Sequence, residues 1–162
     1  MELTTTATGD LTAARVTVAL LARGYEVLKP ITDRLPYDLA ISWFRRNIRL
    51  QVRTAYSRRN GFCVSLQKYK KVRFSVDDCD FILAHIPERD LTYVLPIEEL
   101  GHCEIILRPD NPKSKWAKYK EAWHYVDALL CEPKTALAAY TTTYPSGRRR
   151  SSKRPSELEN TP

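Results

Sequence analysis

The spacing of apolar residues changes along the first third of the chain, and this change constrains the fold more than any other feature. Apolar residues recur at three- and four-residue intervals over Asp10–Arg23, which predicts a helix that Gly24 ends. Over Ile48–Thr54 apolar and polar residues alternate, which is the period of a strand with two different faces. A helix followed by strands predicts a mixed α/β (α+β) domain. The helical set is Leu11, Ala14, Val18 and Leu21, and Val16, Ala19 and Leu20 add apolar surface, so we expect the helix to be largely covered.

The rest of the chain adds further strands and one more helix. The predicted helix over 115–130 has Trp116, Tyr119, Trp123 and Val126 at helical spacing, which indicates an apolar face packed on the sheet or on a partner subunit. From about residue 141 the chain is rich in Thr, Ser, Pro and Arg, with little to bury. We therefore predict a domain over 1–140 and a disordered basic tail over 141–162. The other predicted strands are 25–29, 37–44, 62–66, 80–86, 92–95 and 103–107.

Composition excludes several classes of protein. The four cysteines form no closely spaced pair, so the sequence supports neither a zinc finger nor a redox motif. The first ten residues lack the basic start and apolar run of a signal peptide, and no window approaches 18 apolar residues. We expect an intracellular protein, cytoplasmic or nucleoid-associated, with no membrane partner. The net charge of +7 over 162 residues favours a polyanionic partner.

The positive charge is concentrated in one window. Residues 45–76 hold ten Lys or Arg residues and no Asp or Glu, interleaved with Tyr and Phe. Such cations bind phosphates, and aromatic side chains pack or stack beside them. A solvated surface whose acidic partners lie elsewhere in the fold is the alternative. We expect this window to bind double-stranded DNA through Arg45, Arg46, Arg49, Arg58, Arg59, Lys68, Lys70, Lys71 and Arg73.

Three polar residues are predicted to meet across the first strand pair. Asp38 opens one strand, and Gln51 and Arg53 lie two apart on the next, so they share a face. The Asp38 carboxylate and the Gln51 carbonyl are oxygen ligands of the kind that Mg²⁺ prefers. The Arg53 cation would offset charge on a scissile phosphate. The pattern therefore indicates a metal-dependent phosphodiesterase, with an actual metal site and a purely phosphate-binding strand face both left open.

Seven short stretches follow one another along the chain: Gly9–Leu11, Arg23–Val27, Leu35–Leu39, Leu50–Ala55, Asp78–Phe81, Tyr93–Ile97 and Leu107–Pro109. Together they resemble the PD-(D/E)XK nucleases, specifically the branch of homing endonucleases associated with group I introns. The resemblance covers roughly residues 8 to 125 and implies a restriction-endonuclease-like core, a mixed central β-sheet flanked by helices. It also implies Mg²⁺-dependent hydrolysis of DNA, with Asp38 as central metal ligand, Gln51 as second ligand and Arg53 at the lysine position.

Two departures from the family pattern put the predicted catalysis in doubt. Ala13 stands where the first helix of the family usually carries a glutamate, and Arg53 replaces a lysine. A guanidinium stabilises charge but does not give up its proton to act as a base. The leading hypothesis is a homing-type DNA endonuclease with impaired or altered catalysis. The rivals are a catalytically inactive DNA-binding protein of the same fold and an RNA-binding accessory protein. Cutting both strands requires two active sites, so we expect a homo-oligomer, a dimer or a tetramer.

Overall fold

The structure is a computed structural model that describes residues 4–32, 34–43, 46–69 and 72–130. The predicted tail at 141–162, and residues 131–140 of the predicted domain, lie outside the described residues. The helices are α1 (Thr5–Ala22) and α2 (His124–Leu130), with short 3-10 turns at Pro87–Arg89, Ile97–Glu99 and Ala117–Tyr119. The strands are β1 (Glu26–Leu28), β2 (Leu39–Trp43), β3 (Arg46–Thr54), β4 (Tyr56–Arg58), β5 (Gly61–Ser65), β6 (Gln67–Tyr69), β7 (Val72–Arg73), β8 (Phe81–Ile86), β9 (Leu91–Pro96) and β10 (Glu104–Leu107).

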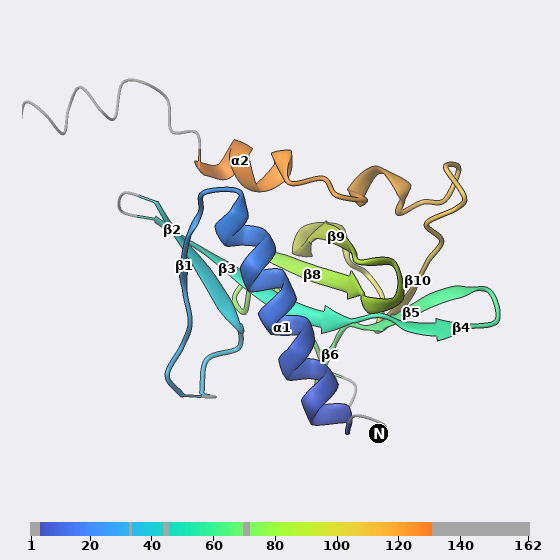
Figure 1. Ribbon diagram of the computed structural model, residues 1–162, viewed down its shortest axis with the longest axis horizontal. Coiled ribbons are helices and arrows are strands. Elements are labelled where there is room, and N and C mark those ends of the chain that lie inside the picture. Colours follow the sequence, from blue (N-terminus) through green and yellow to red (C-terminus); the bar gives the residue numbers. More distant parts are fainter. Residues whose placement is uncertain (1–3, 33, 44–45, 70–71, 131–162) are drawn as a thin grey trace, which may run out of the picture. The chain divides into compact units, whose positions relative to one another are not determined.

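A five-stranded mixed sheet forms the centre of the domain, in the order β1-β2-β3-β8-β9. Neighbouring strands are antiparallel except β3 and β8, which are parallel. A second sheet has the order β10-β5-β4, and β6 pairs with β7. Figure 1 shows α1 crossing one side of the central sheet, with the β4–β5 hairpin extending beyond the end of β3. The predicted mixed central sheet with helices is therefore confirmed.

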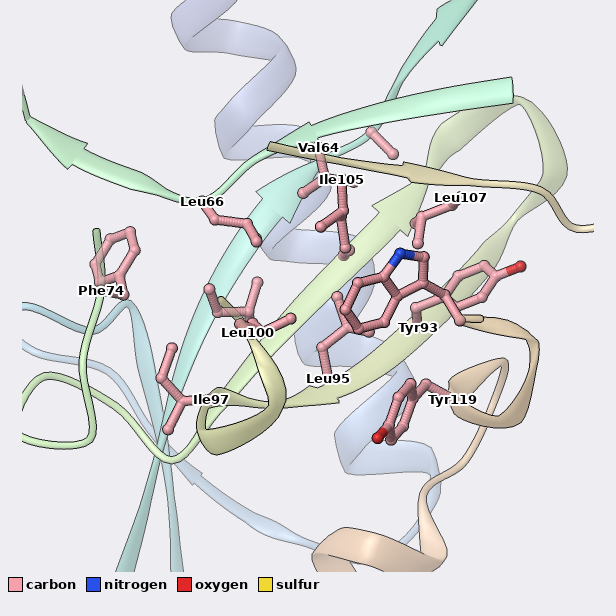
Figure 2. Packing of buried hydrophobic residues seen from close by; sticks show 14 of the residues in the cluster. Val64, Leu66, Phe74, Tyr93, Leu95, Ile97, Leu100, Ile105, Leu107 and Tyr119 are labelled. Carbon is pink, nitrogen blue, oxygen red and sulfur yellow. The ribbon is translucent and has the colours of Figure 1, made fainter. Parts of the chain in front are cut away.

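Two apolar clusters cover the two faces of the central sheet. One cluster joins Val16 and Leu20 of α1 to the sheet and to Trp123 and Val126 near α2. Figure 2 shows the other cluster, in which the β5–β10 sheet packs on the opposite face of β8 and β9. Every residue of β8 is buried, which explains why all of its residues except His85 are apolar, because a strand covered on both faces has no polar side.

The first helix begins earlier than predicted and turns a different side inward. Thr4 caps it, since the Thr4 hydroxyl accepts a hydrogen bond from the Ala7 backbone amide at 3.2 Å. The predicted start at Asp10 is therefore wrong, because Asp10 lies inside the helix. The residues that α1 buries are Thr12, Val16 and Leu20, while the side predicted from spacing is exposed at Leu11, Val18 and Leu21.

The predicted helix over 115–130 is interrupted, and only α2 is α-helical. Lys120 forms a β-bridge with Tyr93, and the Glu121 backbone amide donates to the Thr92 carbonyl at 2.9 Å. Glu121 adopts a positive φ of 49°, which breaks the helical path. The four aromatic and apolar positions are buried as predicted, but they serve different clusters: Trp116 and Tyr119 on one face of the sheet, Trp123 and Val126 on the other.

The predicted strands all exist, with ends shifted by at most two residues. The short strands β4, β6 and β7 were not predicted from the sequence, because two or three residues give no measurable period. No described helix is long and apolar enough to cross a lipid bilayer.

Candidate active site

Asp38 and Gln51 are in direct contact at the edge of the central sheet. Leu39 pairs with Leu50 in the antiparallel register, so Asp38, one residue earlier, stands opposite Gln51. The Asp38 Oδ2 atom accepts a hydrogen bond from Gln51 Nε2 at 2.6 Å and another from the Val52 backbone amide at 2.9 Å. Gln51 is only 5% exposed, so the register and burial together fix the pair. The structure brings together these two residues, as the sequence predicted.

Arg53 lies in the same pocket, but its guanidinium is held by β6 and by the residue that follows β7. Its Nη2 atom donates to the Gln67 carbonyl at 3.0 Å, and its Cζ atom lies 4.9 Å from the centre of the Phe74 ring. Burial lowers the pKa of the Arg53 guanidinium, and the negative charge of Asp38 partly opposes that shift. Because an arginine keeps its proton even so, the site contains a fixed positive charge beside one carboxylate.

The three residues line a pocket of about 530 Å³ between α1 and the end of β3. The N-terminal half of α1 forms one wall, where Gly9, Asp10 and Ala13 line the pocket. Ala13 therefore faces the same space as Asp38, at the helix position where the resemblance implies a glutamate. Within the described ranges no three His, Cys, Asp or Glu side chains gather as a metal-binding group, so the pocket offers fewer charged ligands than a site with two carboxylates.

The structure adds pocket residues that the sequence did not single out. Lys29 lines the same pocket as Asp38. Arg34 lines a neighbouring pocket of about 300 Å³ that shares Asp38 and Gln51 as its wall and also includes Lys68, a residue already predicted to bind DNA. The sequence could have indicated Lys29 and Arg34, because both lie in the segment that leads into Asp38 and that segment must run close to the carboxylate.

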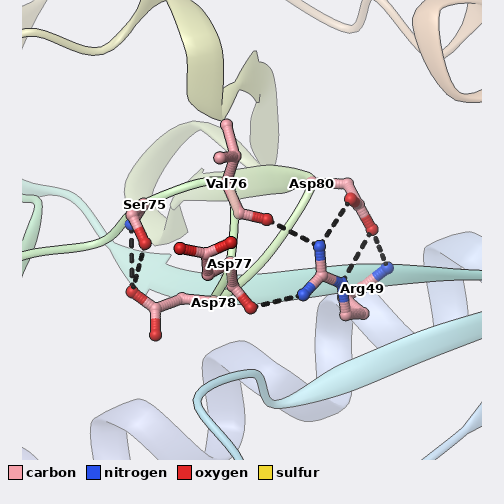
Figure 3. A network of polar contacts seen from close by, with 6 residues as sticks. All are labelled: Arg49, Ser75, Val76, Asp77, Asp78 and Asp80. Atoms are coloured by element: carbon pink, nitrogen blue, oxygen red, sulfur yellow. Dashed lines mark hydrogen bonds and ion pairs between the residues drawn. The ribbon is translucent and has the colours of Figure 1, made fainter.

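Arg49 is engaged inside the protein by acidic and carbonyl groups that lie later in the sequence. Its guanidinium pairs with Asp80 at 2.9 Å and donates to the carbonyls of Asp77 at 2.5 Å and Val76 at 2.7 Å (Figure 3). The Arg49 backbone amide also donates to Asp80 Oδ2 at 2.7 Å. The hydrogen bond to Asp80 is the main cause that raises the pKa of Arg49. We therefore assign Arg49 to the fold rather than to phosphate binding.

Lys68 has a similar partner. Its ammonium group lies 2.5 Å from Asp78 Oδ1, and the Ser75 amide and hydroxyl donate to the other oxygen of Asp78. Burial acts to raise the pKa of Asp78, but the hydrogen bonds from Lys68 and Ser75 outweigh it and hold the pKa below its usual value. The interpretation that acidic partners lie elsewhere in the fold therefore holds for Arg49 and Lys68.

The remaining basic residues of the 45–76 window are spread along the structure. Arg58 and Arg59 are exposed on the β4–β5 hairpin, next to the pocket residue Tyr56. Arg46 is exposed at the start of β3, seven residues from Arg53, or roughly 23 Å along a strand. The exposed Arg73 lies on β7. Arg45, Lys70 and Lys71, also predicted to bind DNA, lie outside the described residues.

The central sheet is mixed, an aspartate lies opposite a polar pair on the adjacent strand, and helix α1 borders the pocket. This is the arrangement of a restriction-endonuclease-like nuclease. The chain belongs to the PD-(D/E)XK endonuclease family, whose model matches residues 3–126. A solved structure of a bacterial homing endonuclease, I-Ssp6803I, is similar to this chain, with a TM-score of 0.68 and 26% sequence identity. The similarity covers 85% of this chain and 99% of that one. No match was found among curated proteins.

Proposed function

We propose that this nuclease is a DNA endonuclease of the homing type that hydrolyses phosphodiester bonds with a bound Mg²⁺ ion. The observation that carries the proposal is the contact between Asp38 and Gln51 in one pocket with Arg53. The family and the similar homing endonuclease support the substrate, duplex DNA.

The donor atoms in the pocket fit one divalent ion bound with modest affinity. Gln51 now directs its amide nitrogen at Asp38, and a half-turn of the amide presents Oε1 to the same place. The Val52 carbonyl lies 3.5 Å from that nitrogen, so a carboxylate, an amide and a backbone oxygen gather there. Mg²⁺ is usually held by one or two carboxylates and keeps several waters. Asp38, Gln51 and the Val52 carbonyl would hold it.

The side chains around this position suit the transition state of phosphodiester hydrolysis. A bound divalent ion supplies positive charge to the phosphoryl oxygens. The Arg53 guanidinium offsets further charge as it develops, and it does not remove a proton from the attacking water. Arg58 and Arg59 bind phosphates beyond the scissile one, on the hairpin next to the pocket. With a single carboxylate, we expect slower cleavage and weaker metal binding than a site with two would give.

The test is nicking of supercoiled plasmid DNA in Mg²⁺ or Mn²⁺. The wild-type chain is compared with Asp38→Ala and with Asp77→Ala, a matched control that removes an exposed carboxylate outside the pocket. We expect nicking by the wild type and by the control, and a loss of at least 100-fold in Asp38→Ala. Chelation of the divalent ion abolishes nicking by all three.

A catalytically inactive DNA-binding protein is the second candidate, and Ala13 together with Arg53 favours it. If wild type and Asp38→Ala are equally inert while both still bind DNA, this candidate replaces the first. Because the described unit holds one such pocket, cleavage of both strands requires a homo-oligomer, a dimer or a tetramer.

A further inference from the structure

Helix α1 carries apolar side chains on two sides, and the fold covers only one of them. Thr12, Val16 and Leu20 are buried against the sheet. On the other side Leu11 is 42% exposed, Val18 64% and Leu21 55%. In Figure 1 this helix lies across the front of the central sheet, with no other described element drawn over it. A contiguous apolar side of this kind marks a contact surface.

The exposed side has the spacing of a two-stranded helical seam. Leu11, Ala14, Val18 and Leu21 are separated by three, four and three residues, which are the a and d positions of a heptad. Val18 falls at an a position and Leu21 at a d position, a combination that favours two strands in parallel coiled coils. Ala14 is exposed and small, so it lets two helices approach closely. We propose that this seam, the residues Leu11, Ala14, Val18 and Leu21, pairs with the same seam of a second copy of the chain.

The charges beside the seam favour a parallel pair. Asp10 falls at the g position before the seam, and Arg15 at the following e position. In a parallel pair a g residue faces the e′ residue five positions later in the partner helix, so Asp10 of each copy meets Arg15 of the other. Both residues are exposed, and Arg15 Nη1 also donates to the Pro87 carbonyl of its own chain at 3.3 Å. In an antiparallel pair g faces g′, and Asp10 would meet the uncharged Thr17 instead.

A parallel pair also suits the chemistry of the neighbouring pocket. Gly9, Asp10 and Ala13 line the pocket from the N-terminal half of α1. Two parallel helices place both pockets at the same end of the pair, where one duplex can reach them. An antiparallel pair would separate them by up to the length of the 18-residue helix, about 27 Å. This step rests on the proposed function, whereas the association itself does not.

The test is the association of the full chain without DNA, measured by sedimentation equilibrium over a range of concentrations. We expect a dimer of the wild type and at least a tenfold increase in its dissociation constant in Val18→Lys, because two lysines then meet at an a position. Val18 is exposed and lysine favours helix more than valine does, so the variant keeps its fold and its unfolding temperature. Val76→Lys is the control, because Val76 is 52% exposed outside the seam and its variant should associate like the wild type.

A charge exchange tests the orientation. Arg15→Glu places two negative charges together in a parallel pair and should weaken association about threefold or more, while Asp10→Arg combined with Arg15→Glu should restore it. A monomeric wild type would overturn the proposal and assign the seam to another segment of this chain or to a different protein. A dimer unaffected by Val18→Lys would overturn it as well. Loss of nicking in a chain that still dimerises would count against the proposed function alone.

Discussion

Gln51 donates a hydrogen bond to Asp38 across 2.6 Å, from the strand directly opposite it. One carboxylate and one amide thus share the position at which a site with two acids would carry two negative charges. The amide satisfies the carboxylate in the absence of metal. This pairing stabilises the free protein and reduces the electrostatic attraction for a divalent ion.

The substitution Gln51→Glu is expected to lower the stability of the free protein and to raise its affinity for Mg²⁺. A second carboxylate within hydrogen-bonding distance of Asp38 in a buried site repels it, so the free variant should unfold several degrees below the wild type. Mg²⁺ should raise the unfolding temperature of the variant more than that of the wild type, because a bound ligand stabilises the state that binds it. Thermal unfolding with chelator and with Mg²⁺ measures both effects. Equal responses to Mg²⁺ would contradict a metal site at this position.

Restoring the family pattern is expected to increase cleavage. Ala13→Glu adds a carboxylate on the pocket wall, and Arg53→Lys supplies a cation that can exchange a proton. We expect plasmid nicking by the double variant at least tenfold faster than by the wild type. Ala22→Glu, at the exposed end of the same helix, is the matched control and should leave the rate unchanged. No gain in the double variant would show that the pocket is not the site of cleavage.

Arg49 and Arg58 are expected to respond to truncation in opposite ways. Arg49→Ala removes the guanidinium that pairs with Asp80 and bonds two backbone carbonyls, so the free energy of unfolding should fall by about 2–3 kcal/mol. Arg58→Ala should change the free energy of unfolding by less than about 0.5 kcal/mol. It should weaken DNA binding and reduce the slope of log affinity against log salt concentration by about one. Urea unfolding and DNA titrations at several salt concentrations separate the two. A destabilising Arg58→Ala would place that side chain in the fold instead.

His85 is expected to make stability depend on pH. Burial lowers the pKa of His85, and Asp90, 3.9 Å away, only partly opposes it. The folded chain therefore binds this proton less readily than the unfolded chain, whose histidine has a pKa of about 6.5. The contribution is complete above that pH and is lost as the pH falls below it, by at most about 1.4 kcal/mol per pH unit. His85→Gln should flatten the slope of unfolding free energy between pH 7 and 5, and the exposed His102→Gln should not.

Much of the candidate site could be predicted because strand pairing is local here. Asp38 and Gln51 are 13 residues apart on adjacent antiparallel strands, so alternation along one strand and a short connection are enough to place them together. The loss of the helix carboxylate was also visible in the sequence. The partner of Arg49 was not, because Asp80 lies 31 residues from Arg49 and the intervening chain must fold back before the charges meet.

The sequence by itself determined the longer strands, the meeting of Asp38 with Gln51 and the family, because strand periodicity and short motifs depend on residues close together in the chain. Only the tertiary structure decided which side of α1 faces the sheet, since apolar side chains surround that helix and spacing alone fits either side. It also decided where the second helix breaks, because the contacts of residues 120–121 with β9 compete with helical hydrogen bonds. In both cases the deciding interactions come from distant segments, whose positions no local pattern encodes.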